Sequence, residues 1–336
     1  MRKMKRATAL ILITVLAYPV TLFSQQFETK YLDGMQWAKG NIHTHARKGE
    51  GDSSVESIVQ WYRDHDYQFL VITDHDVVTY LPELSARSDS TFILIPGEEI
   101  TGYGGDLDFE INGLNIEQAI PPLHGETIPL ALQLCIDSVR GQNGIPLINH
   151  PNYKWRMNAE ILLGMQDAFI MEIFNGCPGS NCEGDAVHPT AEQLWDSLLS
   201  SGKRVYGVAT DDAHEYQKFA PGLSNPALGW VVVQVAQLTA EQVMQNLENG
   251  LFYSSTGVEI ETIRIEPTRI TIRMKESNEV PYQTEFIGNG GKVLSTVLSN
   301  PAVFQLSAQP VSGGYVRAKV TNRLGQLAWI QPVFIH

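Results

Sequence analysis

Histidine and carboxylate side chains recur along the chain in five short motifs, which hold five of its nine histidines. Imidazole and carboxylate groups together are ligands that zinc, manganese and iron accept in proteins. One such residue alone is weak evidence, because a single histidine at a strand end is more often a hydrogen-bonded loop residue, and alternate residues of any strand share a face. Five motifs in order predict a metal centre. The motifs are His43-Thr-His45, Thr73-Asp-His-Asp76, Gly97-Glu-Glu99, Asn149-His-Pro151 and Thr210-Asp-Asp-Ala-His214.

Strand-like apolar runs alternate with amphipathic helical stretches from about residue 38 to 258. The runs are Phe69–Thr73, Phe92–Pro96, Ile145–Asn149, Ala168–Glu172 and Arg204–Val208. The helical stretches include Ser54–Asp64, Ile128–Arg140, Ala191–Ser201 and Thr239–Asn249. Continuous apolar strands between helices predict a parallel sheet that is covered on both faces or closed as a barrel. The motifs stand at the carboxyl ends of the strand candidates, where the loops of a barrel converge, so we expect them to meet.

After Thr256 the pattern changes to short alternating segments separated by Gly, Asn and Pro. The segments are Val258–Ile265, Arg269–Met274, Tyr282–Ile287, Lys292–Leu298, Val303–Leu306, Tyr315–Thr321 and Leu327–Phe334. Such a run of strands without helices is typical of a small all-β domain, most simply a sandwich. The sequence thus predicts an α/β domain over residues 27–258 and a C-terminal β domain over residues 259–336. We interpret the C-terminal domain as an accessory for packing or substrate access.

The first residues are typical of a secretory signal peptide. Arg2–Arg6 is rich in basic residues, Ala7–Val20 is apolar, and polar residues follow. We expect residues 1–24 to be removed and the protein to be periplasmic or secreted. A membrane anchor is the alternative, but a span needs roughly 18 to 20 apolar residues, more than this unbroken stretch offers. We expect no stable membrane insertion after the signal peptide is removed.

Composition excludes some classes of protein. A chain of 336 residues that is 43% hydrophobic is too apolar to stay disordered. With 24 Lys and Arg against 37 Asp and Glu, the net charge of -13 argues against a nucleic-acid partner held by phosphate attraction. Cys177 and Cys182 are close enough to bridge a loop, which an exported chain permits, or they stay free. Composition does not predict the oligomeric state.

The motifs, in this order, resemble those of the polymerase and histidinol phosphatase (PHP) family of metal-dependent hydrolases. The resemblance covers about residues 38–258 and extends to three phrases typical of secreted bacterial members. These are Asn149–Asn152, Met171–Gly176 and Phe252–Gly257. It implies an α/β fold, a distorted (β/α)7 barrel of PHP type, here followed by the small all-β, sandwich-like domain. It also implies two or three divalent metal ions, of zinc, manganese or iron.

The resemblance implies a set of metal ligands, residue by residue. A first metal would be bound by His43, His45, Glu98 and Asp212, and Glu98 would bridge to a second metal held by His150. His75 and His214 would hold a third, helped by Glu50, with Asp52 as the alternative. Glu110 stands where relatives often have a histidine ligand of the second metal, so either Glu110 or His124 would take that place. Asp74 and Asp211 are expected to orient the imidazoles.

The chemistry that follows is hydrolysis of an ester by a metal-bridging hydroxide, which Asp212 and Glu98 would position. The leading hypothesis is an exported phosphoesterase (EC 3.1) acting on a small, phosphorylated molecule, with Arg156 as the preferred phosphate-binding residue among the cations of the nearby loops. Solvated surface cations are the alternative for Arg156, and for Arg47, Lys48 and Lys154. The sequence lacks a Gly-x-Ser-x-Gly motif, so serine hydrolase chemistry is unsupported. Two alternatives stay open: hydrolysis of carbamate, carboxylic or other non-phosphate esters, and a degenerate, non-catalytic metal- or glycan-binding protein.

Overall fold

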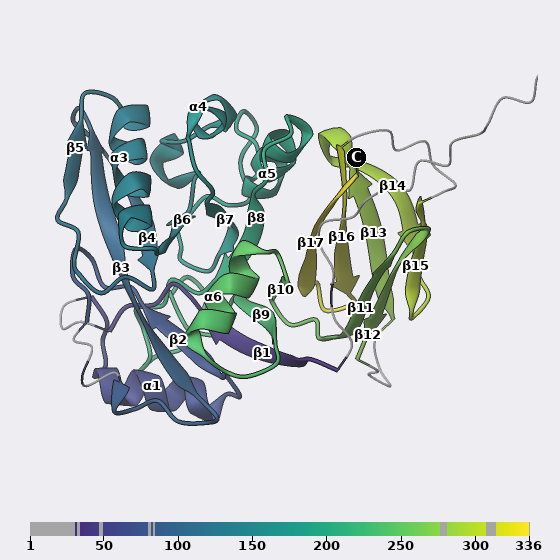
Figure 1. Cartoon of the computed structure of the whole chain (residues 1–336), viewed down its shortest axis with the longest axis horizontal. Coiled ribbons are helices and arrows are strands. Elements are labelled where there is room, and N and C mark those ends of the chain that lie inside the picture. Colours follow the sequence, from purple (N-terminus) through teal and green to yellow (C-terminus); the bar gives the residue numbers. More distant parts are fainter. Residues whose placement is uncertain are drawn as a thin grey trace, which may run out of the picture.

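The computed structural model describes residues 31, 34–46, 50–79, 82, 85–275, 281–306 and 314–335. The predicted signal peptide and the cations Arg47 and Lys48 lie outside these residues. Figure 1 shows the helices gathered around the strands of the left-hand part, whereas the strands that follow residue 258 lie on the right. In the described part of the chain, no helix is long and apolar enough to cross a membrane.

The helices match the predicted helical stretches to within one residue at each end, and one short helix was not predicted. They are α1 (Val55–Asp64), α3 (Ile128–Gly141), α4 (Ala159–Gly164), α5 (Ala191–Ser200) and α6 (Ala240–Glu248), with 3-10 turns at Tyr153–Trp155 and Asn289–Gly291. Hydroxyl groups of Ser54, Thr190 and Thr239 accept backbone N–H groups in the first turns of α1, α5 and α6. Because these N–H groups have no partner inside the helix, such caps fix where each helix begins.

The strands of the first part form one mixed sheet. They are β1 (Gln36–Asn41), β2 (Phe69–Ile72), β3 (Ile93–Gly104), β4 (Leu107–Leu114), β5 (Leu123–Gly125), β6 (Ile145–Ile148), β7 (Ile170–Asn175), β8 (Tyr206–Thr210), β9 (Trp230–Val235) and β10 (Phe252–Ser255). Their order is β10-β9-β1-β2-β3-β4-β6-β7-β8, with β5 paired to β3. The sets β1-β2-β3 and β6-β7-β8 are parallel, as predicted, but β4 is antiparallel to β3 and β6 because β3 turns back as a hairpin before α3.

Beyond the ends of β1 and β8, the chain makes one more parallel pairing. Thr44 and Ala213 form an isolated bridge. The N–H of Asp212 donates to the carbonyl of His43, and the N–H of His45 donates to the carbonyl of Ala213, both at 3.0 Å. This pairing places the first and the last histidine motifs side by side. The ladder of named strands in the described residues does not close on itself, so the closed barrel stays a prediction.

Among the described residues after 258, seven strands coincide with the seven predicted segments. They are β11 (Ile260–Glu266), β12 (Arg269–Met274), β13 (Tyr282–Gly288), β14 (Lys292–Val297), β15 (Ala302–Gln305), β16 (Gly314–Asn322) and β17 (Leu327–Ile335). β11, β12 and β15 form a separate sheet, whereas β13, β14, β16 and β17 continue the large sheet, since β17 pairs with β10. Apolar side chains from both groups, such as Ile272, Phe304, Phe286 and Val320, share one core. The boundary at residue 258 stays a prediction.

A buried ionic network joins α5 to β16. Arg317 is 2% exposed, and its guanidinium donates to both carboxylate oxygens of Asp196 at 2.7 Å. It also lies 2.8 Å from Glu192 and packs on the ring of Trp195. Burial lowers the pKa of Arg317, but Asp196 and Glu192 outweigh burial and raise it. Buried, desolvated ion pairs therefore connect the C-terminal strand β16 to helix α5 of the first part.

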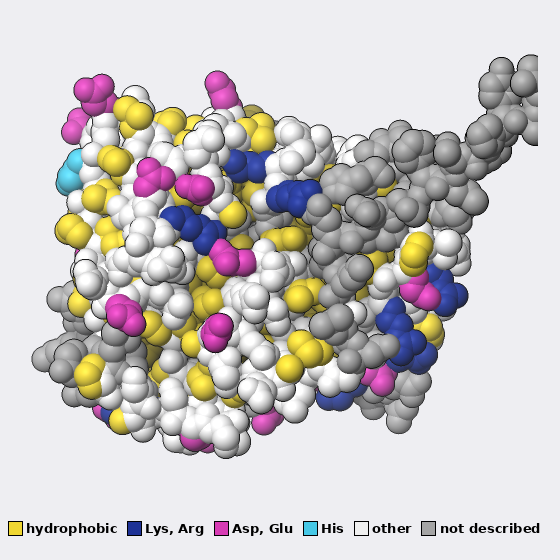
Figure 2. Space-filling model, in the orientation of Figure 1, with side chains coloured by type: hydrophobic (Ala, Val, Ile, Leu, Met, Phe, Trp, Pro, Cys, Tyr) yellow, Lys and Arg dark blue, Asp and Glu magenta, His cyan; other side chains and the backbone are white. Residues whose placement is uncertain are grey.

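Some of the acidic side chains are buried inside the protein. Figure 2 shows acidic side chains scattered among basic and apolar ones on one face of the molecule. Other carboxylates are at most 5% exposed, and they gather near the strand ends. They include Asp74, Glu98, Glu99, Glu172, Asp211 and Asp212. Because a buried charge is costly unless it is paired, these carboxylates require hydrogen-bond donors, protonated imidazoles or cations.

Candidate metal centre

Four buried side chains converge beyond the ends of β1 and β8 and beside the middle of β3. Nε2 of His43 lies 3.3 Å from both Glu99 Oε1 and Asp212 Oδ1. Nε2 of His45 lies 3.1 Å from both Glu99 Oε2 and Asp212 Oδ1. One possible ligand atom from each of the four residues lies within 4.8 Å of the other three. The structure thus brings the first and last motifs together through the Thr44–Ala213 bridge.

The electrostatics of this cluster fit a divalent cation. Burial lowers the pKa of His43, but Asp212, Glu99 and Glu172 outweigh burial and raise it well above its usual value. Burial raises the pKa of Glu99, but the neighbouring imidazoles, led by His43, outweigh burial and lower it. Nε2 of His43 is buried and has no hydrogen-bond partner among the described residues. A divalent ion supplies the positive charge that protonated imidazoles otherwise supply, and two carboxylates with two imidazole nitrogens are a suitable donor set.

A second group of possible ligands shares Glu99 with the first. Nε2 of His150 lies 3.5 Å from both Glu99 Oε1 and Glu110 Oε2. Burial, with the nearby charge of Glu99, raises the pKa of Glu110. His124 stacks on Tyr103 at 4.6 Å between ring centroids, on strands β5 and β3. The structure therefore brings Glu110, and not His124, to this group.

A third group lies on the other side of the central cluster. Nε2 of His75 is 3.3 Å from Glu99 Oε2, and Nε2 of His214 is 3.3 Å from Asp212 Oδ1. Glu50 lies between the two histidines: its carboxylate accepts the N–H of His75 at 2.9 Å, and its carbonyl oxygen is 2.9 Å from Nδ1 of His214. The predicted acid of the loop after His45 is therefore next to both of its expected partners.

Glu98 is not part of the cluster, and Glu99 occupies the position expected for it. Neighbouring residues of a strand point to opposite faces, so only one of the two glutamates can face the histidines. Oε2 of Glu98 accepts the N–H of Ile120 at 2.8 Å, and its Oε1 is buried without a hydrogen-bond partner. Burial raises the pKa of Glu98 to about 7. The expectation that Glu98 bridges two metals is therefore wrong, because Glu99 and not Glu98 faces the histidines.

Glu172 orients the histidines, and sequence reasoning missed it. Its Oε1 lies 2.7 Å from Nδ1 of His43 and accepts the hydroxyl of Thr210 at 2.7 Å. Its Oε2 accepts the backbone N–H of His150 at 2.6 Å and the side-chain amide of Asn175 at 2.8 Å. A carboxylate on Nδ1 keeps the proton there and turns the Nε2 lone pair toward the cluster. The available signal was its position as the last residue of a predicted strand.

Asp211 and Asp74 accept hydrogen bonds from both backbone and side-chain groups around the cluster, so their role in orienting imidazoles stays a prediction. Oδ1 of Asp211 accepts the N–H groups of residues 228 and 229 at 2.7 and 2.9 Å, which fixes the chain ahead of β9. Asp74 accepts the N–H of Ala46 at 2.7 Å, and one of its oxygens lies within 4.8 Å of possible ligand atoms of His45 and Glu50. Asp52, the alternative to Glu50, accepts a backbone N–H from the loop that follows His214.

A cavity of about 180 Å³ opens onto the cluster. Besides residues of the three groups, it is lined by Tyr153, Cys177, Pro178 and Ser180. Burial, with the nearby carboxylate of Asp212, raises the pKa of the Cys177 thiol to about 12. All three cysteines are free in the structure, so Cys177 and Cys182 form no disulfide in it. A small ester group would fit into a space of this size.

Arg156 lies beside this cavity without lining it. Its guanidinium donates to the carbonyl and to a carboxylate oxygen of Asp108, at 3.2 and 3.3 Å. Lys154 also pairs with Asp108, at 2.6 Å, and its ammonium lies over the ring of Tyr153, which does line the cavity. In this structure both cations thus pair with the same carboxylate, that of Asp108.

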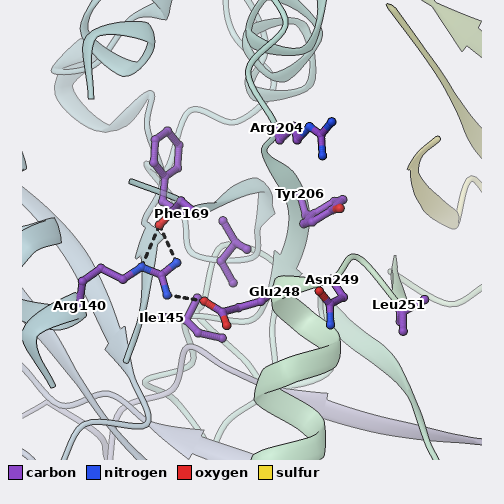
Figure 3. Close-up of a pocket in the computed structure, with 10 residues that line it drawn as sticks. Arg140, Ile145, Phe169, Arg204, Tyr206, Glu248, Asn249 and Leu251 are labelled. Carbon is purple, nitrogen blue, oxygen red and sulfur yellow. Dashed lines mark hydrogen bonds and ion pairs between the residues drawn. The ribbon is translucent and has the colours of Figure 1, made fainter. Parts of the chain in front are cut away.

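A different cavity, of about 500 Å³, lies at the opposite ends of the strands. Ile145, Ile170 and Tyr206, with which β6, β7 and β8 begin, line it. Figure 3 shows the guanidinium of Arg140 bonded to the carbonyl of residue 168 and to Glu248. Because that cation is already held by the fold, and because the amino ends of barrel strands serve stability, we assign the chemistry to the smaller cavity.

Comparison with known proteins gives distant similarities in structure. No protein-family model and no curated protein matches the chain. A two-domain protein from Bacteroides vulgatus, described as containing a predicted PHP-like metal-dependent phosphoesterase, is 15% identical, with a TM-score of 0.46 over 88% of this chain and 94% of its own. A candidate metal-dependent phosphoesterase from Bifidobacterium adolescentis is 14% identical, with a TM-score of 0.39 over 56% of this chain and 92% of its own. An amidohydrolase from Chromobacterium violaceum, solved with sulfate and no metal, is 14% identical, with a TM-score of 0.39 over 56% and 94%. At these sequence identities and TM-scores, the similarities support no conclusion about function. A functional conclusion must therefore come from the geometry of the site.

Proposed function

We propose that this chain is a metal-dependent phosphoester hydrolase of the PHP family. The observation that carries the proposal is the convergence of His43, His45, Glu99 and Asp212 on one buried point, flanked by two further groups that share Glu99 and Asp212. The parallel bridge beyond β1 and β8 supports a distorted barrel of seven strands, namely β1, β2, β3, β4, β6, β7 and β8.

The proposed centre holds two or three divalent ions, of zinc, manganese or iron. The ligands would be His43, His45, Glu99 and Asp212 for the first ion, Glu99, Glu110 and His150 for the second, and Glu50, His75 and His214 for the third. Bound divalent ions activate water as a nucleophile and stabilise negative charge on phosphoryl oxygens. Glu110 in place of an imidazole makes the second position richer in oxygen, which suits manganese better than zinc.

The protein's own contribution is to orient these side chains and to limit water. Glu172 holds the proton of His43 on Nδ1, and the carbonyl of Glu50 does the same for His214. Both histidines then present an unprotonated Nε2 to the cluster. His43, His45 and Glu99 are at most 1% exposed, so the charges act in a medium of low polarity, where they are strongest.

The substrate that we propose is a small phosphorylated ester that enters the cavity beside Tyr153 and Ser180. A phosphate-binding role for Arg156 stays a prediction, because that side chain is paired with Asp108 in this structure. Export to the periplasm or the medium is proposed from residues 1–24 alone.

Turnover of p-nitrophenyl phosphate and of bis-p-nitrophenyl phosphate by metal-loaded protein tests this proposal. We expect activity with manganese or zinc that EDTA abolishes, and a loss of at least about 100-fold for Glu99→Gln, since a ligand of two ions is removed. Glu98→Gln is the matched control, because it makes the same chemical change one residue away on the opposite face. Metal-dependent hydrolysis of aryl carboxylic esters alone would favour the non-phosphate hydrolase. Full metal occupancy without any turnover would favour a binding protein.

A further inference from the structure

Cys177 is connected to the proposed metal centre by hydrogen bonds through the side chain of Asn175. The residue follows β7 by two positions, and its N–H donates to Oδ1 of Asn175 at 2.8 Å. Nδ2 of the same Asn175 donates to Asp212 Oδ2 at 3.2 Å and to Glu172 Oε2 at 2.8 Å. Gly176 is fixed as well, because its N–H donates to the carbonyl of Thr210 at 3.0 Å. The position of the thiol relative to Asp212 is therefore built into the fold.

The thiol lies close to two of the proposed metal ligands. The sulfur of Cys177, a carboxylate oxygen of Asp212 and a ring nitrogen of His214 all lie within 4.8 Å of one another. The atoms around one tetrahedral zinc ion are separated by roughly 3.5 Å, as follows from metal–ligand bonds of about 2.0–2.3 Å. Small side-chain rotations thus bring these three atoms to bonding distance. Cys177 also lines the cavity together with Asp212 and His214, and in this structure its thiol lies 3.6 Å from the carbonyl of Pro178.

A second observation points to a cation at this position. Oδ1 of Asp212 is approached to 3.3 Å by Nε2 of His43, which is fully buried and has no hydrogen-bond partner. Nε2 of His45 and of His214 approach the same oxygen to 3.1 and 3.3 Å. Three ring nitrogens thus surround one carboxylate oxygen, and a bound cation would pair with that oxygen and with the buried nitrogen of His43.

We propose that Cys177 is a metal ligand, whose thiolate joins His214 around the third ion, beside Asp212, and makes that one position prefer zinc over manganese. The inference rests on the proposed metal centre and extends it by a sulfur donor. Thiolate is a soft ligand that favours zinc, whereas carboxylate and water suit manganese. When the metal–sulfur bond forms, the thiol proton passes to solvent, and no oxidant or reductant is required.

X-ray absorption at the zinc edge of the full-length, zinc-loaded protein tests the inference directly. We expect a sulfur neighbour at about 2.3 Å beside nitrogen and oxygen neighbours at about 2.0–2.1 Å. The sulfur should vanish in Cys177→Ser and Cys177→Ala, and it should persist in Cys182→Ser, a matched change in the same loop. Competition between the two metals should show the preference for zinc falling at least tenfold in Cys177→Ser and not in Cys182→Ser.

A wild-type spectrum with nitrogen and oxygen neighbours alone would overturn the inference while leaving the phosphoesterase proposal intact. A sulfur neighbour that persists in Cys177→Ser would overturn it as well. The wild-type measurement decides even if a variant fails to fold, and circular dichroism identifies that case. Absence of zinc binding by the wild-type protein would refute both the inference and the proposed metal centre.

Discussion

Replacement of Glu172 by glutamine is expected to weaken metal binding although Glu172 is not a proposed ligand. Each carboxylate oxygen serves two donors: Oε1 serves His43 Nδ1 and Thr210, and Oε2 serves the N–H of His150 and the amide of Asn175. Glutamine keeps only one oxygen. If its NH₂ faces His43, that imidazole must carry its proton on Nε2, toward the cluster. If it faces the N–H of His150, a buried donor loses its acceptor.

The expected loss of metal affinity is roughly 10- to 100-fold, or about 1.4–2.7 kcal/mol, because removing a carboxylate that hydrogen-bonds a metal-binding histidine has effects of this size. The assay is titration of metal-free protein with zinc against a chromogenic chelator, with Glu98→Gln as the control for a buried glutamate that does not contact the histidines. Affinity of Glu172→Gln within twofold of the wild type, in a protein with an intact fold, would refute the reasoning.

Three further predictions concern stability. Arg317→Met leaves the carboxylate of Asp196 buried without its cation, whereas Glu192 keeps its pairing with Lys319, so the free energy of unfolding should fall by about 3–5 kcal/mol; a loss below about 1 kcal/mol in a urea titration would contradict the buried network. EDTA should lower the melting temperature, since zinc at about 100 times its Kd stabilises the folded state by about 2.7 kcal/mol; equal melting temperatures with and without zinc would count against the metal centre. Burial raises the pKa of Glu98 to about 7, so the folded protein resists its ionisation, and metal-free wild type should lose stability relative to Glu98→Gln as the pH rises from 5 to 8. Denaturant titrations at both pH values check this, and the opposite trend would show that Glu98 is stabilised as a carboxylate.

The order of the elements was readable from the sequence, because periodicity and caps are local signals. The seven strands after residue 258 and the helix starts at Ser54, Thr190 and Thr239 match the structure closely. The antiparallel insertion of β4 was missed, since a strand pattern does not reveal which neighbour it pairs with. The bridge between Thr44 and Ala213 joins residues far apart in the chain, and only the folded state defines it.

Some residues of the site could be found from local sequence motifs, and others only from the folded structure. The motifs identified the region, and the structure brings together His43, His45, Glu50, His75, Glu110, His150, Asp212 and His214. The choice between Glu98 and Glu99 depended on a shift of one residue, which reverses the face that a strand presents. Glu172 was missed because its contacts with His43 and His150 come from other strands, and no local pattern encodes them.

The central claim is that His43, His45, Glu99 and Asp212 bind a divalent ion. Anomalous diffraction at the manganese and zinc edges, from crystals of the metal-loaded protein, tests it most directly. We predict an anomalous peak bounded by these four side chains, with further peaks beside Glu110 and His150 or beside His75 and His214. A map from active, metal-loaded protein with no peak at the four side chains would contradict the account.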